Sequence, residues 1–346
     1  MHVAEDRRRG SFGLSGIVGR SRGMIELFGN VRRAASTDAH VLILGESGVG
    51  KERVSRAIHE QSGRRAGPFL PINCAAIPEN LLEAELFGYE RGAFTGAQVS
   101  KEGLLEVADG GTLLLDEVCE LTPSLQAKLL RAVEEGSVRR LGGRRPTPLD
   151  VRFMASTNRD IHGEMRQGRF REDLFFRLDV IEIRVPPLRE RLEDIPLLAA
   201  HFLRACSARN GKKIDAIAQE ALELLTGYDW PGNVRELENA IERAFAYTRG
   251  PSITLEDLPE AVLRGAHRED SYGFRAWKRK TLERLEREFL TKALEQHGGN
   301  VSRAARALGL HRSTLQRLMR SRSLASASRL SDVASLRPPY PVTLAD

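Results

Sequence analysis

Cysteines and long apolar stretches are scarce in this sequence, and their scarcity excludes several classes of protein. Only 3 of the 346 residues are cysteines. Because the spacing of Cys74, Cys119 and Cys206 fits neither a disulfide framework nor a zinc site, we expect three small buried side chains. No stretch approaches the roughly 18 uninterrupted apolar residues of a membrane span, and residues 1–10 lack the apolar core of a signal peptide. These absences predict a cytoplasmic protein with no membrane partner.

The chain also lacks a strong overall charge, because 53 Lys and Arg stand against 47 Asp and Glu. Its 41% of hydrophobic residues is ordinary for a folded protein and excludes a fibrous or wholly disordered chain. The formal excess of +6 lies in residues 296–322, which hold six arginines and no acid. A short basic segment on an otherwise neutral chain indicates contact with nucleic acid.

The order of apolar patterns along the chain predicts its fold class and its domains. Strand-length apolar runs alternate with helical patterns over residues 16–185, which is typical of an α/β fold with a mainly parallel sheet. Residues 186–260 follow a Pro-Pro pair and show helical periodicity, so we expect a small helical lid that ends near Pro259. We interpret the other segments as a flexible arm (1–15), a linker (261–277), an all-α DNA-binding domain (278–322) and a disordered tail (323–346).

A glycine-rich loop follows the first apolar strand and precedes a helical pattern. In such a loop the glycines let backbone N–H groups face phosphate oxygens, and Lys51 reaches the outer phosphates. Glu52 stands where Ser or Thr usually supplies a hydroxyl ligand, so Mg²⁺ must depend on another acid and on water. The other interpretation is a glycine-rich turn that binds nothing. The predicted ATP-binding residues are Gly45, Glu46, Ser47, Gly48, Val49, Gly50, Lys51 and Glu52.

Two adjacent acids end the apolar strand that begins near Thr112. Parallel sheets of this type bind ligands at the carboxyl ends of their strands. We therefore expect Asp116 to hold Mg²⁺ and Glu117 to polarise the attacking water. On its own, an Asp-Glu pair is more often a solvated strand end; the glycine-rich loop upstream favours the nucleotide site.

Between these two motifs lies a hexapeptide that resembles one family closely. Its residues are Gly92, Ala93, Phe94, Thr95, Gly96 and Ala97. At every position it is similar to the signature of the AAA+ activators of sigma-54 RNA polymerase, the bacterial enhancer-binding proteins, in which it forms the tip of a loop that touches the sigma factor. The resemblance covers about residues 16–322 and implies an AAA+ P-loop NTPase core with a helical lid, followed by an all-α helix-turn-helix domain. Without this context, the hexapeptide would be taken for a hairpin turn with Phe94 in the core.

The resemblance also implies roles for single residues around the nucleotide. Asn73 matches the switch asparagine that orients the catalytic glutamate, here Glu117, and Asn158 matches the sensor of the γ-phosphate. Arg171 and Arg177 match the arginine fingers that reach the ATP of a neighbouring subunit, although pairing with nearby acids is the simpler explanation for an arginine. Arg235 matches the arginine of the lid that contacts nucleotide, and the strip that cradles adenine matches Ile17, Val18 and Gly19.

The basic segment has the pattern of a helix-turn-helix and resembles the Fis-type motif of the same family. Asn300 can cap a first helix, Ala304 and Ala305 allow close packing, and Gly309 falls in the turn. A basic helical hairpin that serves only packing is the alternative. The residues expected to contact DNA bases or phosphates are Arg303, Arg306, His311, Arg312, Ser313, Thr314, Gln316, Arg317 and Arg320.

Together these features predict an ATPase that activates sigma-54-dependent transcription. It would bind DNA upstream of promoters, assemble as a homo-oligomer (a hexamer, with a dimer at rest) and remodel the sigma-54 holoenzyme from the closed into the open complex. Because residues 1–15 leave no room for a sensor domain, we expect a protein that is either constitutively competent or controlled by its abundance or by a partner protein acting in trans. Two alternatives stay open: a DNA-binding repressor or scaffold whose nucleotide site only controls oligomerisation, and an AAA+ remodeller of another protein.

Overall fold

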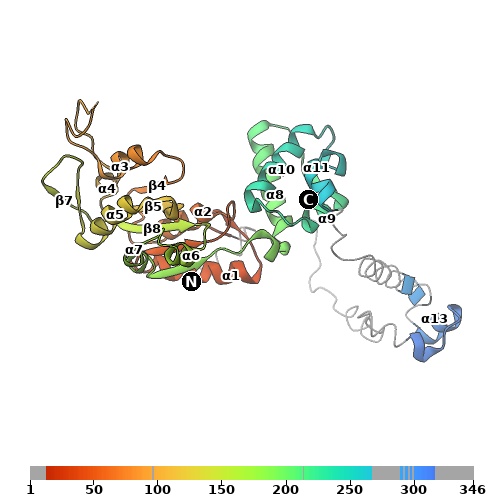
Figure 1. The fold of residues 1–346 in the computed structure, drawn as a ribbon. Helices are drawn as coiled ribbons and strands as arrows, with labels where there is room; N and C mark the ends of the chain where they lie inside the picture. Colours follow the sequence, from red (N-terminus) through yellow and green to blue (C-terminus); the bar gives the residue numbers. More distant parts are fainter. Residues whose placement is uncertain are drawn as a thin grey trace, which may run out of the picture. The chain divides into compact units, whose positions relative to one another are not determined.

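The computed structural model describes residues 13–95, 97–212, 214–266 and 300–315, together with a few positions between 289 and 297. The chain divides into two compact units, residues 1–266 and 267–346, which are considered separately (Figure 1). None of the helices in the described residues is both long and apolar enough to cross a bilayer.

A five-stranded parallel sheet organises the first unit, and its strands lie in the order β4-β5-β8-β3-β9. Its strands are almost entirely apolar because both faces are covered by helices. Leu42, Leu113 and Phe153 face one hydrophobic core, whereas Ile43 and Met154 face the other. The strands are β3 (Val41–Leu44), β4 (Phe69–Asn73), β5 (Thr112–Asp116), β8 (Arg152–Thr157) and β9 (Ile181–Arg184).

Helices cover the two faces of this sheet as the βα order requires (Figure 1). The first two helices pack on one face, and the helices between β4 and β9 supply most of the other core. This arrangement confirms the expected α/β class with a parallel sheet. The helices are α1 (Arg22–Ala35), α2 (Lys51–Glu60), α3 (Glu79–Phe87), α4 (Leu104–Val107), α5 (Pro123–Glu135), α6 (Ile161–Arg166) and α7 (Glu172–Leu178).

A helical lid follows the sheet and has a core of its own, centred on the fully buried Trp230. It consists of α8 (Ile195–Asn210), α9 (Gln219–Gly227), α10 (Asn233–Tyr247) and α11 (Glu260–Ala266). The expected lid end near Pro259 is too early, because Val262 of α11 is buried in this core. A proline is tolerated at the start of a helix, and here it precedes α11 rather than closing the lid. The segment interpreted as a linker from residue 261 thus begins inside a packed helix.

Short elements complete the first unit. The antiparallel pair of β1 (Gly13–Leu14) and β2 (Ile17–Val18) buries Leu14, so the last residues of the expected flexible arm belong to the fold. The other strands are β6 (Ser137–Arg139), β7 (Pro146–Pro148), β10 (Ala216–Ile217) and β11 (Ser252–Ile253). The 3₁₀-helices are η3 (Val118–Glu120), η4 (Leu188–Glu190), η5 (Leu192–Asp194) and η6 (Leu255–Asp257). All three cysteines are buried and free, as expected.

The described part of the second unit is a helical turn motif. Helix α13 (Val301–Ala307) is followed by a turn and by helical residues 312–315. The side chain of Asn300 accepts hydrogen bonds from the N–H groups of Ser302 and Arg303, which confirms it as the N-cap. Gly309 has φ +64°, a left-handed conformation that glycine adopts without strain. The tail predicted at residues 323–346 lies outside the described residues.

Candidate nucleotide site and nucleic-acid interface

The phosphate-binding loop connects β3 to α2 and bends through two left-handed glycines. Gly48 has φ +76° and Gly50 has φ +103°. A Cβ atom on Gly48 would lie 2.3 Å from the carbonyl oxygen of Gly232 in the lid, so no other residue fits there without moving the lid. Lys51 is the first residue of α2, where the amino end of the helix adds partial positive charge.

Lys51 lies in the interior of the site and contacts both the loop and Glu117, the second of the two adjacent acids. Its side chain is only 6% exposed. The Nζ atom donates to the carbonyl oxygen of Gly45 at 3.0 Å and to Oε1 of Glu117 at 3.2 Å. Glu117 has φ +56°, and its Oε2 accepts the backbone N–H of Asn158 at 3.0 Å. The structure thus brings Lys51, Glu117 and Asn158 together.

Asp116 ends β5 and is held by the two strands beside it. Its Oδ1 accepts a hydrogen bond from Oγ of the buried Ser156 at 2.5 Å, and its Oδ2 lies 3.4 Å from Nδ2 of Asn73. Sequence reasoning missed Ser156, because a serine inside an apolar strand carries no motif. Beside these acids, burial above all raises the pKa of the Cys74 thiol to about 12, so this cysteine stays protonated near neutral pH.

Asn73 contacts a different acid from the one expected of a switch asparagine. Its Oδ1 accepts the N–H groups of Ala75 and Ala76, and its Nδ2 faces Asp116 rather than Glu117. Because Asn73 and Asp116 are register partners on β4 and β5, their side chains start side by side, whereas Glu117 turns away through its left-handed backbone.

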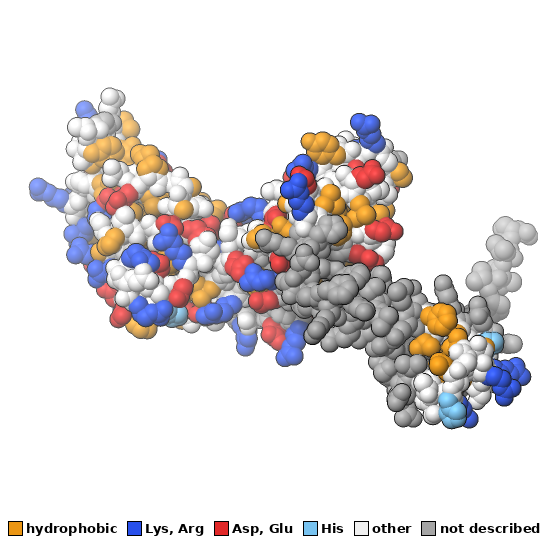
Figure 2. Space-filling model, turned by 45° about the vertical axis from the view of Figure 1, so that its right-hand side comes forward, with side chains coloured by type: hydrophobic (Ala, Val, Ile, Leu, Met, Phe, Trp, Pro, Cys, Tyr) orange, Lys and Arg blue, Asp and Glu red, His pale blue; other side chains and the backbone are white. Residues whose placement is uncertain are grey.

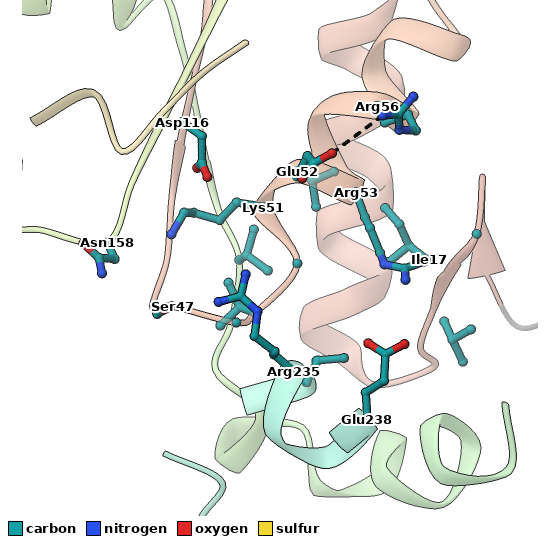
Figure 3. Close-up of a pocket in the computed structure, with 18 of the residues that line it drawn as sticks. Ile17, Ser47, Lys51, Glu52, Arg53, Arg56, Asp116, Asn158, Arg235 and Glu238 are labelled. Carbon is teal, nitrogen blue, oxygen red and sulfur yellow. Dashed lines mark ion pairs between the residues drawn. The ribbon is translucent and has the colours of Figure 1, made fainter. Parts of the chain in front are cut away.

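A cavity of about 670 Å³ lies between the sheet and the lid, and it gathers most of the predicted nucleotide residues (Figure 3). We call it the nucleotide cavity. Lys51, Asp116 and Asn158 lie on one side of it, and Arg235 reaches in from the lid. The predicted residues that line it are Ile17, Val18, Ser47, Gly48, Val49, Gly50, Lys51, Glu52, Asn73, Asp116, Glu117, Asn158 and Arg235.

Three of the predicted cofactor residues do not line this cavity, namely Gly19, Gly45 and Glu46. The Glu46 carboxylate instead faces Arg189, whose guanidinium donates two hydrogen bonds to it at 2.6 and 2.8 Å. This pairing, with a further hydrogen bond from Asn233, holds the pKa of Glu46 down to about 2. Glu46 is therefore an anion bound by the protein itself.

The cavity also has walls that the sequence patterns do not reveal. Ser15 and Gly16 come from the turn before β2, His201 and Phe202 from α8, and Glu238 from α10. Glu238 lies one helical turn after Arg235, so both side chains point into the cavity (Figure 3). The sequence signals these walls only through the helical periodicity of α10, and such periodicity indicates packing rather than contact with a ligand.

The two predicted arginine fingers lie outside the nucleotide cavity of their own chain. Arg171 precedes α7 and pairs with Asp173 at 2.6 Å, while Arg177 lies on α7 and pairs with Glu134 at 3.0 Å. Both side chains are about half exposed, at 46% and 58%. Neither lines the cavity. Pairing with an acid close by in the sequence, the simpler explanation, therefore holds for Arg171, whereas Arg177 pairs with an acid of α5; a role of either residue in ATP hydrolysis requires a neighbouring subunit.

The hexapeptide lies on a hairpin between α3 and α4. The stem of this hairpin closes through a β-bridge between Tyr89 and Lys101. Tyr89 also forms a bridge with Leu141, which lies between β6 and β7. The hexapeptide hairpin and the β6–β7 hairpin therefore lie at the same end of the sheet domain (Figure 1). Phe94 is 46% exposed and packs edge-on against Tyr89, with ring centroids 5.0 Å apart. Thr95 is exposed, whereas Ala97 is buried. Gly96 lies outside the described residues.

The helix-turn-helix presents cations on its surface and hides its small residues. Ala304, Ala305 and Leu315 are buried, as the pattern predicts. The described part of this unit shows blue side chains and no red ones in Figure 2. The exposed residues predicted to contact DNA are Arg303, Arg306, His311, Arg312 and Ser313, with Thr314 half-buried. Gln316, Arg317 and Arg320 lie outside the described residues.

Comparison with known proteins places this architecture in one family. Residues 17–184 match the sigma-54 interaction domain, residues 189–272 the AAA+ ATPase lid domain, and residues 281–320 the bacterial regulatory proteins of the Fis family. The chain belongs to the family of sigma-54-dependent transcriptional activators. The resemblance of the hexapeptide and its neighbouring motifs to this family is thus confirmed.

Individual relatives agree with this assignment. The chain is 48% identical to the transcriptional regulatory protein ZraR of Escherichia coli over 300 residues, which cover 87% of this chain and 67% of ZraR. It is 46% identical over 314 residues to the nitrogen fixation protein AnfA of Azotobacter vinelandii, covering 91% of this chain and 58% of AnfA. The structure of NtrX from Brucella abortus in complex with ATP superposes with a TM-score of 0.68 at 36% identity, covering 93% of this chain and 72% of NtrX.

Membership of the family shows an ATPase domain and a DNA-binding domain, whereas the fit of a metal ion has to be judged from the side chains of the site. The AAA+ sigma-54 domain belongs to an ATPase family that uses nucleotide, and the Fis-type motif is a DNA-binding one. Among the described residues, no cluster of three or more His, Cys, Asp or Glu side chains could enclose a metal ion. Asp116 and Glu117 fit Mg²⁺ in another way, because this ion keeps several waters and takes one or two carboxylates together with phosphate oxygens.

Proposed function

We propose that this activator hydrolyses MgATP in the nucleotide cavity and uses the energy to remodel the sigma-54 holoenzyme. The observation that carries the proposal is the convergence of Lys51, Asp116 and Glu117 at the carboxyl end of β5, directly beside the phosphate-binding loop. Lys51 neutralises the outer phosphates. Ser156 orients the carboxylate of Asp116, which holds Mg²⁺. Bound Mg²⁺ neutralises negative charge on the phosphate oxygens. Glu117 orients the attacking water, and Asn158 senses the γ-phosphate.

Hydrolysis in this proposal needs a second subunit. Arg171 and Arg177 do not line the cavity of their own chain, and their side chains are about half exposed, which supports a role at the cavity of a neighbour. There a guanidinium would offset the charge that develops on the transferred phosphoryl group. We therefore propose a homo-oligomer, a hexamer when active and a dimer at rest, with ATP bound near the interfaces. We also propose that a separate regulatory protein controls this assembly in trans.

Two surfaces connect the ATPase to transcription. The exposed Phe94 and Thr95 on the hexapeptide hairpin contact sigma-54, and Gly92, with φ +84°, permits the tight turn beside them. The helix-turn-helix binds DNA upstream of the promoter, where Arg312 and Ser313 face bases and Arg303 and Arg306 face phosphates. We accordingly propose that the protein acts in the cytoplasm, together with the polymerase and the promoter DNA.

The test is open-complex formation on a sigma-54 promoter by wild type and Thr95→Ala, each with ATP and without nucleotide. We expect opening only by the wild type with ATP, while Thr95→Ala retains ATP turnover because Thr95 lies outside the nucleotide cavity. A wild type that hydrolyses ATP and binds DNA without opening the promoter would instead be a repressor or scaffold, or a remodeller of another protein.

A further inference from the structure

Glu46 and the lid meet outside the nucleotide cavity, at the outer side of the phosphate-binding loop. Besides the two hydrogen bonds from Arg189 of η4, the Glu46 carboxylate accepts one from Nδ2 of Asn233 at 3.1 Å. The same Nδ2 donates to the carbonyl oxygen of Ser47 at 3.0 Å. One amide group at the start of α10 thus binds two consecutive residues of the loop.

Asn233 is also fixed from its other side. Its Oδ1 accepts the buried backbone N–H of Leu188 at 2.8 Å, and its own N–H donates to the carbonyl oxygen of Trp230 at 2.8 Å. The side chain is fully buried, and the backbone has φ +53°, a left-handed conformation that asparagine tolerates better than most residues. Buried amides with all partners in place have one orientation, so Asn233 sets the position of the loop relative to α10.

The backbones of the loop and the lid touch next to this amide. Gly48 abuts the carbonyl oxygen of Gly232, and the N–H of Arg235 donates to the carbonyl oxygen of Gly48 at 3.2 Å. Arg235 and Glu238 project from the same helix into the nucleotide cavity. The loop that faces the phosphates and the helix that carries these two side chains are therefore joined at three successive residues, Glu46, Ser47 and Gly48.

We propose that Asn233 is a positioning residue that locks the phosphate-binding loop to the start of α10, so that Arg235 is held in register with the bound phosphates and the loop and the helix respond to nucleotide as one body. The inference rests on the proposed ATPase function. Asn233 touches no nucleotide itself, because it does not line the cavity. Glu46 acts in the same way, as an anchor on the protein side of the loop rather than as a nucleotide ligand.

The deletion variant is Asn233→Gly, because glycine adopts the left-handed backbone that alanine would strain. We expect kcat for ATP to fall between about 10-fold and 100-fold, since a misplacement of about 1 Å in a site has such an effect. We expect the affinity for ADP to change less than about 3-fold, because Lys51 and the glycines of the loop remain in place. Glu46→Gln, which keeps the shape and removes the charge, should lower kcat in the same direction by a smaller factor.

The controls are Asn239→Ala, on the exposed face of the same helix, and Glu182→Gln, which removes the acid of an exposed ion pair with Arg184. Both should turn over ATP like the wild type. If Asn233→Gly and Glu46→Gln lower only the thermal midpoint while kcat stays at the wild-type value below that midpoint, the two residues are merely structural and the inference is wrong.

Hydrogen exchange resolved by segment tests the coupling without hydrolysis. In the wild type, ADP should protect both residues 45–50 and residues 232–238; in Asn233→Gly it should protect only the first segment. Protection of both segments in the variant would overturn the inference. A wild type that neither binds nor hydrolyses nucleotide would contradict the proposed function itself, whereas a fully active wild type matched by Asn233→Gly contradicts the inference alone.

Discussion

We propose that the phosphates of one ATP contact Lys51 of one subunit and Arg177 of the next. The surroundings of these two cations differ sharply. Lys51 is 6% exposed and is held by the loop and by Glu117. Arg177 is 58% exposed, and its partner, Glu134, is exposed as well. An ion pair between exposed groups is worth at most about 1 kcal/mol and is readily exchanged. Lys51, which we propose serves its own site, is thus fixed by its own chain, whereas Arg177, which we propose serves a neighbour, is held only by an exposed ion pair.

The largest expected effect tests whether Arg177 serves a neighbour. Arg177→Ala should lower ATP turnover about 1000-fold in the assembled protein, as for other arginine fingers. Mixing it with the equally inactive Lys51→Ala should restore part of the activity, because some interfaces then combine an intact Lys51 site with an intact Arg177. Arg166→Ala, which removes another exposed ion pair, is the control. A mixture that stays inactive would assign Arg177 to its own chain.

The second prediction compares the contributions to stability of a residue that the fold buries and of one that it leaves exposed. Leu113→Ala empties a fully buried position in the central strand and should lower the free energy of unfolding by about 2–5 kcal/mol. Phe94→Ala removes a half-exposed ring and should change it by less than about 0.5 kcal/mol while abolishing promoter opening. Urea unfolding of both variants measures the difference. A large loss of stability in Phe94→Ala would show that the hexapeptide belongs to the core.

The third prediction concerns how firmly Asp116 is held. Ser156→Ala removes the hydrogen bond to Oδ1 of Asp116 and should raise the Mg²⁺ concentration needed for half-maximal turnover about 10-fold. Titration of ATPase activity with Mg²⁺ measures it. Ser62→Ala also removes a buried hydroxyl, but one that donates to His59 outside the site, and should leave the Mg²⁺ requirement unchanged. An equal shift in both variants would point to a general loss of packing.

The smallest expected effect is the pH dependence of the contact between loop and lid. Because the pKa of Glu46 falls from about 4.5 to about 2 on folding, its contribution to stability is complete above pH 4.5 and is lost as the pH falls toward 2. The difference in unfolding free energy between wild type and Glu46→Gln should therefore be constant from pH 5 to pH 8 and shrink below pH 4.5. A difference that stays constant down to pH 2.5 would contradict the pairing with Arg189.

The sequence allowed prediction of the parts of the site that follow from local pattern. An apolar strand followed by a glycine-rich turn indicates where Lys51 lies, and a strand that ends in Asp116 places that acid at the same edge of the sheet. Contacts between distant segments carry no such signal. Ser156 meets Asp116 only because β8 pairs with β5, and Asn233 meets Glu46 only because the lid folds back on the loop.

The end of the N-terminal arm and the end of the lid could not be placed from the sequence, because the residues there give no local sign of being buried. Residues 13–15 are too few to show a strand pattern, but the pairing of β1 with β2 buries Leu14 in a core that also holds Met154 and Ile183 from far along the chain. A proline such as Pro259 is often found just after a helix ends, but here it precedes helix α11. In both cases tertiary packing decided what local propensity left open.

The turn between β1 and β2 has a practical consequence. Ser15 and Gly16 line the nucleotide cavity, and the chain enters the fold immediately before them. A shortened chain that began after Gly16 would therefore lose part of the cavity wall together with strand β1. Truncated versions of the protein meant for nucleotide-binding studies should thus keep Ser15 and Gly16.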